Sequence, residues 1–118
     1  MTSLLIVDDS ATSRLLFKAH LPKNAEYDIH EAGDAETGLN MAIELQPDLI
    51  VLDYNMPDKN GVELAEAMQA AGINGKYALL TANTQKSVVD AANELGFVAV
   101  VDKPITAEGI RALLDQVS

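Results

Sequence analysis

This 118-residue chain contains no cysteine, few basic residues and no long apolar run. The absence of cysteine excludes thiol catalysis and cysteine-ligated metals. Only 8 basic residues oppose 18 acidic ones, and the net charge of −10 offers no basic surface for nucleic acid. No stretch resembles a signal sequence, a membrane span or a Gly/Ser- or Pro-rich linker. The sequence therefore predicts one soluble, cytoplasmic domain over residues 1–118, with neither nucleic acid nor a membrane as a partner.

Five short apolar segments recur along the chain, with helical patterns between them. Four are unbroken, as in parallel strands that are covered on both faces, and lie at residues 4–7, 49–52, 77–80 and 98–101. Residues 27–30 alternate between apolar and polar, which is typical of an edge strand. The apolar run from Phe97 to Val101, on the other edge strand, is either covered by flanking helices or part of a docking face formed with residues 84–95 and 106–117.

Helix signals fill the gaps between these segments. Start signals occur at Ser10, Asp34, Thr84 and Thr106. Apolar residues follow at helical spacing, for example Ala35, Leu39, Ala42 and Ile43, and, less regularly, Leu15, Leu16 and Ala19. Strict alternation of strand and helix predicts a doubly wound α/β fold with a five-stranded parallel sheet. Ligands of such sheets bind beyond the carboxyl ends of the strands.

Polar residues stand where four of the predicted strands end. Asp8 and Asp9 follow the first strand, Asp53 the third, Thr81 the fourth and Lys103 the fifth. These side chains should gather at one edge of the sheet. Three converging carboxylates would repel one another unless a cation intervened, and oxygen ligands without His or Cys favour Mg²⁺.

A carboxylate in such a cluster can accept a phosphoryl group and form an acyl phosphate. Lys103 could then hold one phosphoryl oxygen, the Thr81 hydroxyl a second and Mg²⁺ a third. Each residue also has an ordinary interpretation on its own. Asp8 and Asp9 could cap a helix, Asp53 could belong to a turn, and Lys103 could be a solvated surface charge. The convergence of all these groups at one edge favours the functional interpretation.

Four ordered motifs resemble the receiver domain of two-component response regulators. They are Asp8-Asp9 after "LLIV", "LDYNMP" with Gly61 eight residues past Asp53, Thr81-Ala82 after "YALL", and Lys103-Pro104 after "VAVVD". The match covers nearly the whole chain, and its length is similar to that of single-domain, chemotaxis-type regulators. The resemblance implies a flavodoxin-like (βα)5 fold with strand order 2-1-3-4-5.

Carried over residue by residue, the resemblance implies that Asp53 accepts a phosphoryl group from a sensor histidine kinase or phosphotransfer protein. Asp9, Asp53 and the main-chain carbonyl of Asn55 would bind Mg²⁺ directly, and Asp8 mainly through water. Lys103 would pair with Asp53, and the Lys103-Pro104 peptide would be cis. The phosphorylated form would then select a downstream protein target.

The resemblance also assigns residues around the phosphoryl group. Thr81 would be the switch hydroxyl and the Ala82 amide a neighbouring donor. Asn55 and Asn83 would flank the approach of water and tune the phosphoryl lifetime.

The sequence departs from the family pattern at Val100, where many members carry Tyr or Phe. In the family's switch model that aromatic ring turns inward as the switch Thr moves, and valine is too small and too stiff at χ1 to do so. We therefore hypothesise that output runs through the loop after Thr81 and the helix of residues 84–95.

Two rival functions differ in chemistry. A haloacid-dehalogenase-type phosphatase also forms an aspartyl phosphate, but it needs a second Asp where this chain has Asn55. A pseudo-receiver would keep the fold as a binding module without phosphorylation, which Val100 leaves open. The sequence predicts a signalling module that catalyses its own phosphorylation and dephosphorylation rather than an enzyme.

Overall fold

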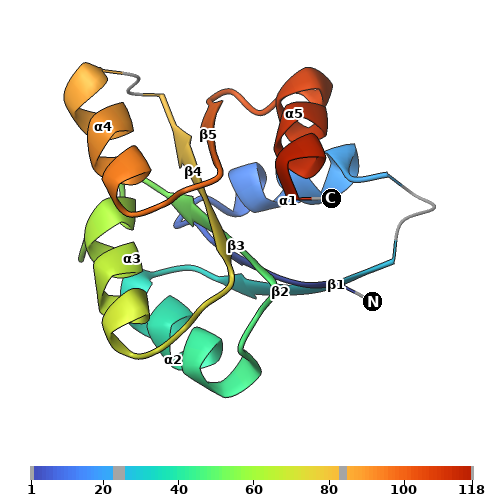
Figure 1. The fold of residues 1–118 in the computed structure, drawn as a ribbon. Coiled ribbons are helices and arrows are strands. Elements are labelled where there is room, and N and C mark those ends of the chain that lie inside the picture. Colours follow the sequence, from blue (N-terminus) through green and yellow to red (C-terminus); the bar gives the residue numbers. More distant parts are fainter. Residues whose placement is uncertain (1, 23–25, 83–84, 118) are drawn as a thin grey trace.

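The structure is a computed structural model that describes residues 2–22, 26–82 and 85–117. Within these ranges, five strands alternate strictly with five helices (Figure 1). The elements are β1 (Thr2–Val7), α1 (Ala11–His20), β2 (Tyr27–Ala32), α2 (Ala35–Leu45), β3 (Leu49–Asp53), α3 (Gly61–Ala70), β4 (Lys76–Thr81), α4 (Lys86–Glu94), β5 (Ala99–Asp102) and α5 (Ala107–Val117).

The strands form one parallel sheet in the order β2-β1-β3-β4-β5, which confirms the predicted fold and places β2 at an edge. Leu52 of β3 lies opposite Val7 of β1, and Asp53 lies opposite Leu80 of β4. The strand order reverses beside β1, between β1 and β3. Residues that follow these two strands therefore meet at the switch point of the sheet, where such folds bind ligands.

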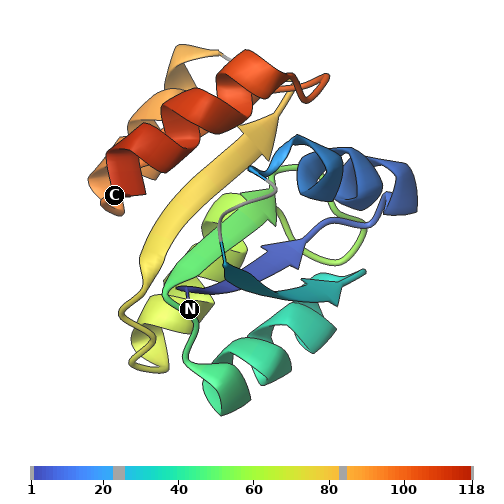
Figure 2. The same cartoon turned by 90° about the vertical axis from the view of Figure 1, so that its right-hand side faces the viewer.

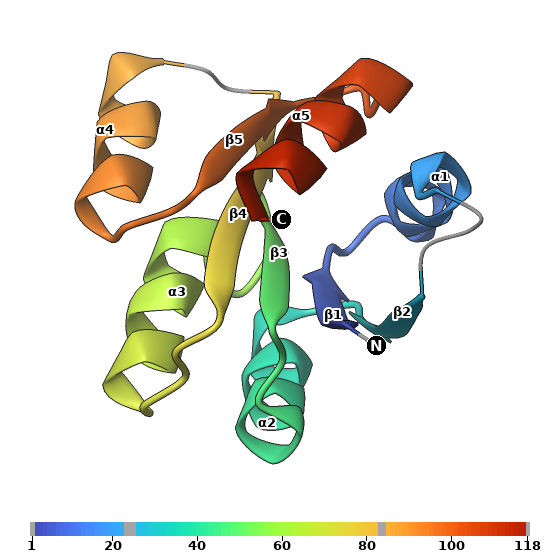
Figure 3. The same ribbon diagram turned by 45° about the vertical axis from the view of Figure 1, so that its right-hand side comes forward.

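Helices cover both faces of the sheet. In Figures 2 and 3, α1 and α5 lie on one face, and α2, α3 and α4 lie on the other. Because side chains alternate along a strand, Leu4 and Ile6 of β1 pack in the first layer, whereas Leu5 and Val7 pack in the second. This burial on both faces explains why the strands read as unbroken apolar runs. Among the described residues, no helix is long and apolar enough to cross a bilayer.

Three of the predicted helix starts are confirmed by capping hydrogen bonds. The Ser10 side chain accepts from the Ser13 amide, Asp34 from Thr37, and Thr106 from Gly109. The predicted start at Thr84 lies outside the described residues. A capping box at α3, in which Asn60 and Glu63 bond to each other's backbone amide, was not predicted.

The predicted apolar face of α1 is wrong. Phe17 is the residue that α1 buries, whereas Leu15 is 62% and Leu16 39% exposed. Phe17 belongs, together with Leu21, to the buried cluster on this face of the sheet, so α1 turns Phe17 toward the sheet and Leu15 and Leu16 toward solvent. On α2, Ala35 and Ala42 are buried as predicted, but Ile43 is 49% exposed.

Candidate functional site

Three carboxylates meet at the carboxyl ends of β1 and β3. One oxygen from each of Asp8, Asp9 and Asp53 lies within 4.8 Å of the others. Asp8 and Asp53 are buried, and Asp9 is exposed to solvent. The structure therefore brings together the three acidic residues that the sequence singled out, and leaves one side of the cluster open.

Lys103 joins two of these carboxylates. Its Nζ lies 3.0 Å from Oδ2 of Asp8 and 3.1 Å from Oδ1 of Asp53. The pair with Asp53 was predicted, but the pair with Asp8 was not. Burial alone would lower the pKa of Lys103, but its hydrogen bonds and ion pairs with both carboxylates outweigh burial and raise it. Lys103 is therefore a stable cation between the two buried acids.

Asp53 remains destabilised as an anion despite Lys103. Burial raises the pKa of the Asp53 carboxyl to about 6, and the negative charge of Asp8 acts in the same direction. Lys103 opposes both effects without cancelling them. A hard divalent cation would remove this residual penalty, and the all-oxygen donor set fits Mg²⁺.

Asp8 is held by two contacts that the sequence did not reveal. Its Oδ1 accepts a hydrogen bond of 2.9 Å from the Ser10 amide, and its backbone carbonyl accepts one from the Arg14 guanidinium. Arg14 also pairs with Glu31 of β2 at 3.1 Å. The sequence could have pointed to Arg14 only as a basic residue in the first turn of the first helix. Its partners are Asp8, directly after β1, and Glu31 of β2, so only the tertiary structure identifies them.

Gly61 allows α3 to approach Asp53 closely. A Cβ atom at this position would lie 2.7 Å from the backbone oxygen of Asp53 and 2.8 Å from Cδ1 of Leu79. The Gly61 amide donates to the Tyr54 carbonyl, and the Tyr54 amide donates to the Leu80 carbonyl. The segment that follows Asp53 is therefore anchored at both ends.

The other predicted site residues lie on β4, β5 and the loops that follow β3 and β4. Thr81 is fully buried at the end of β4, while Asn55 and Ala82 are exposed in the loops beyond β3 and β4. The Lys103-Pro104 peptide is cis, as predicted. Val100 is half-buried, with Leu79 as its register partner in β4. Asn83 lies outside the described residues.

The fifth strand is only partly covered. Its first two residues are half-buried, and a groove of about 810 Å³ runs between β5 and α5, lined by Val101, Pro104 and Ala112 among others. Phe97 and Val101 at the two ends of the predicted run are buried, and residues 98–100 between them are half-buried, so the flanking helices cover the run in part. α5 packs against β5 and leaves this groove open along the strand.

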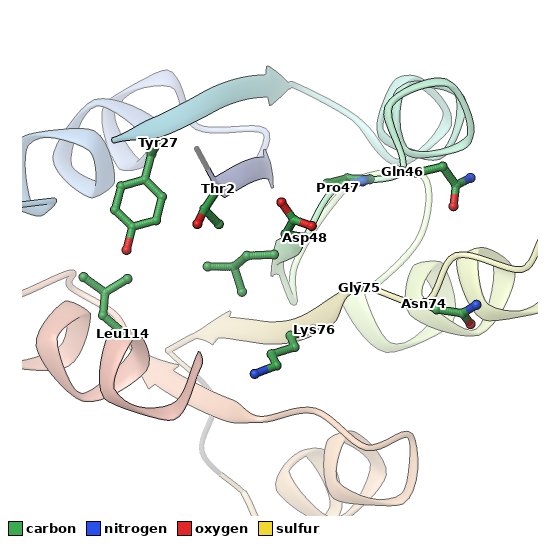
Figure 4. A pocket seen from close by; sticks show the side chains of 10 residues that line it. Thr2, Tyr27, Gln46, Pro47, Asp48, Asn74, Gly75, Lys76 and Leu114 are labelled. Carbon is green, nitrogen blue, oxygen red and sulfur yellow. The ribbon is translucent and has the colours of Figure 1, made fainter. Parts of the chain in front are cut away.

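A cavity of about 550 Å³ lies at the opposite, amino edge of the sheet (Figure 4). It contains none of the predicted site residues. In Figure 4, Gln46 and Asn74 extend to one side, whereas Tyr27 and Leu114 lie at the other. Its polar side chains do not converge on a common point, so the acidic cluster remains the candidate site.

Comparisons with known proteins agree with this geometry. Residues 4–115 match the response regulator receiver domain. The probable chemotaxis protein CheY of Rhizobium etli is 35% identical over 116 residues, covering 97% of this chain and 90% of that protein. Chemotaxis protein CheY of Thermotoga maritima is 30% identical, with 98% and 96% covered.

A solved structure is similar over the same length. Vibrio cholerae chemotaxis protein CheY4 superposes with a TM-score of 0.87 at 28% identity, covering 100% of this chain and 99% of that one. Sequence and fold lead to one conclusion: this chain belongs to the receiver-domain family of two-component response regulators.

Proposed function

We propose that this receiver domain accepts a phosphoryl group on Asp53 and acts as a phosphorylation-controlled switch. The observation that carries the proposal is the position of Asp53, which is buried at the end of β3, within reach of Asp8 and Asp9 and ion-paired to Lys103. A buried carboxylate beside a fixed cation is suited to nucleophilic attack with electrostatic stabilisation of the transferred group.

In the proposed reaction, an Asp53 carboxylate oxygen attacks the phosphorus of a phosphohistidine on a sensor kinase or phosphotransfer protein. The oxygen–phosphorus bond forms as the phosphorus–nitrogen bond breaks, and the histidine leaves with its electron pair. Lys103 and the Thr81 hydroxyl would donate to two phosphoryl oxygens, and the Ala82 amide would be a further donor. Positioning and charge supply most of the catalysis in such a transfer.

Asp8, Asp9, Asp53 and the Asn55 carbonyl are the proposed Mg²⁺ ligands. The bound ion would neutralise the carboxylates and the charge of the phosphoryl oxygens. Without it, Lys103 is the one cation that pairs with the buried carboxylates of Asp8 and Asp53 among the contacts described above. The negative charge of the phosphoryl group would then reorder nearby loops and select a downstream target.

Intact-mass spectrometry after incubation with acetyl phosphate and Mg²⁺ tests the proposal. The wild-type chain should gain the mass of one phosphoryl group, whereas Asp53→Asn and wild type with a chelator should not. No gain in the wild-type chain would support the pseudo-receiver alternative. Rapid multiple turnover of a phosphomonoester would support the phosphatase alternative.

A further inference from the structure

Asp58 connects the loop between β3 and α3 to a different helix. It stands five residues after Asp53, and its carboxylate reaches the start of α2. Its Oδ2 accepts hydrogen bonds from the amides of Ala35, at 3.1 Å, and Glu36, at 3.3 Å, and its Oδ1 lies 3.3 Å from the Ala35 nitrogen. The loop is thus tied to an element that lies more than 20 positions earlier in the sequence.

These contacts satisfy helix amides that have no partner within the helix. The local cap, Asp34, accepts a hydrogen bond from the Thr37 amide at 2.7 Å. Asp58 accepts from the amides of the two residues before Thr37. Burial alone would raise the pKa of the Asp58 carboxyl, but the hydrogen bonds from the Ala35 and Glu36 amides outweigh it and lower the pKa. Two carboxylates from separate segments therefore cap α2 together.

The same loop carries a proposed metal ligand. It begins at Tyr54, whose amide donates to the Leu80 carbonyl, and it ends at the capping box of Asn60. Between these anchors, Met56 packs on the core and Asp58 binds α2. Asn55 is exposed and lies between the first anchor and these two contacts.

We propose that Asp58 is a positioning residue for the acidic site, because its hold on α2 fixes the loop that presents the Asn55 carbonyl beside Asp53. This inference rests on the proposed function in one respect, namely that Mg²⁺ binds at the cluster. The hydrogen bonds from the α2 amides to Asp58 do not involve the ion. The inference therefore has a consequence in metal-free protein as well as in Mg²⁺ binding.

The experiment compares Asp58→Ala with Asp34→Ala, which removes one negative charge and one cap from the same helix. Amide hydrogen exchange without divalent cations should be faster in residues 54–60 of Asp58→Ala, by about fivefold or more. The dissociation constant for Mg²⁺, measured by calorimetric titration, should rise by a similar factor. Asp34→Ala should speed exchange at the start of α2 but leave the loop and the Mg²⁺ affinity within about twofold of wild type.

Asp58→Asn keeps one acceptor oxygen and should lie between wild type and Asp58→Ala in both measurements. Wild-type exchange in the loop of Asp58→Ala would overturn the inference, as would an equal effect of Asp34→Ala on the loop. An asparagine variant no better than alanine would contradict the hydrogen-bonding role. If the wild-type chain binds no Mg²⁺, the proposed function fails, and the exchange comparison still decides the role of Asp58.

Discussion

The carboxylate of Asp53 lies in an environment that disfavours its charge. Asp53 is 3% exposed, and Lys103 forms ion pairs with both Asp53 and Asp8. The pKa of Asp53 is raised to about 6 by burial first and by Asp8 second, while Lys103 lowers it. This balance makes the metal-free stability of the domain dependent on pH.

Asp53→Asn should stabilise the metal-free domain at pH 8. The pKa of Asp53 in the folded state exceeds its usual value of 3.8, so the folded protein binds more protons than the unfolded chain between about pH 4 and pH 6. The contribution of Asp53 to the free energy of unfolding is therefore most favourable at low pH and is lost as the pH rises through 6. Removing the charge should raise the free energy of unfolding by roughly 1–3 kcal/mol at pH 8, and by less near pH 4.

Urea denaturation with a chelator measures this effect. Asp102→Asn, which removes an exposed carboxylate next to Lys103, is the matched control and should change the free energy of unfolding by less than about 0.5 kcal/mol. A destabilised Asp53→Asn at pH 8 would contradict the account.

Lys103→Met should raise the pKa of Asp53 further and slow phosphorylation. Without the ammonium group, the buried carboxylates of Asp8 and Asp53 lose the cation that they share. The rate with acetyl phosphate should fall on the order of tenfold to a hundredfold. Carbon-detected NMR titration of the Asp53 carboxyl measures the pKa.

Lys86→Met provides the comparison for Lys103. Lys86 is 88% exposed and pairs with Asp90 on the surface of α4. It should leave both the pKa of Asp53 and the phosphorylation rate unchanged. Equal effects of the two variants would show that general loss of positive charge, and not the position of Lys103, is responsible.

The helices and strands differ in how well the sequence predicted them. Strands β1, β3 and β4 were identified because burial on both faces requires unbroken apolar runs. The face of α1 could not be read in the same way, since Leu15, Leu16 and Phe17 are consecutive and only packing decides which is buried. Residues at the strand ends were found because chain topology alone brings them together.

Apart from the local capping box of Asn60 and Glu63, the contacts that escaped prediction depend on tertiary structure. Arg14 donates to the Asp8 carbonyl, and Asp58 accepts from an amide of α2. The sequence spacing of these residues does not predict either contact. Lys103 pairs with Asp8 as well as with Asp53, a choice that depends on side-chain geometry at the sheet edge. The sequence therefore indicated which residues form the cluster but not what holds them.

The junction of β3 and α3 should not tolerate a side chain at Gly61. Gly61→Ala would place a methyl group 2.7 Å from the Asp53 backbone oxygen, so the strand end or the helix must move. The expected loss is about 1–3 kcal/mol in urea denaturation, with slower phosphorylation. Gly33→Ala, whose Cβ would meet its nearest atom at 3.7 Å, should be nearly neutral. Similar losses for the two variants would contradict the close-approach argument.

Phosphorylation should alter α4 and the preceding Ala82 without a large movement at Val100. Val100 is half-buried and packs against the core cluster on the α2, α3 and α4 face of the sheet, and valine is too small and too stiff at χ1 to reproduce the inward turn of an aromatic ring. Relaxation-dispersion NMR of the free and phosphorylated forms should show changes in residues 82–95. An unchanged segment would refute this route of output.

The whole chain carries a net charge of −10, and three of its carboxylates lie in one cluster. Mg²⁺ should therefore stabilise it specifically, by about 2.7 kcal/mol at a concentration one hundred times the dissociation constant. Thermal unfolding with MgCl₂, and with NaCl at equal ionic strength, separates site binding from screening. Equal stabilisation by the two salts, or full retention of the Mg²⁺ effect in Asp9→Asn, would contradict specific binding.

The most direct test of the account locates the phosphoryl group itself. The chain is incubated with phosphodonor and Mg²⁺, the acyl phosphate is reduced with borohydride, and the modified peptide is sequenced by mass spectrometry. The account predicts modification at Asp53 alone, with none in Asp53→Asn. Modification of Asp8 or Asp9 in the wild-type chain, or unmodified Asp53 under conditions that phosphorylate a known receiver domain, would contradict it.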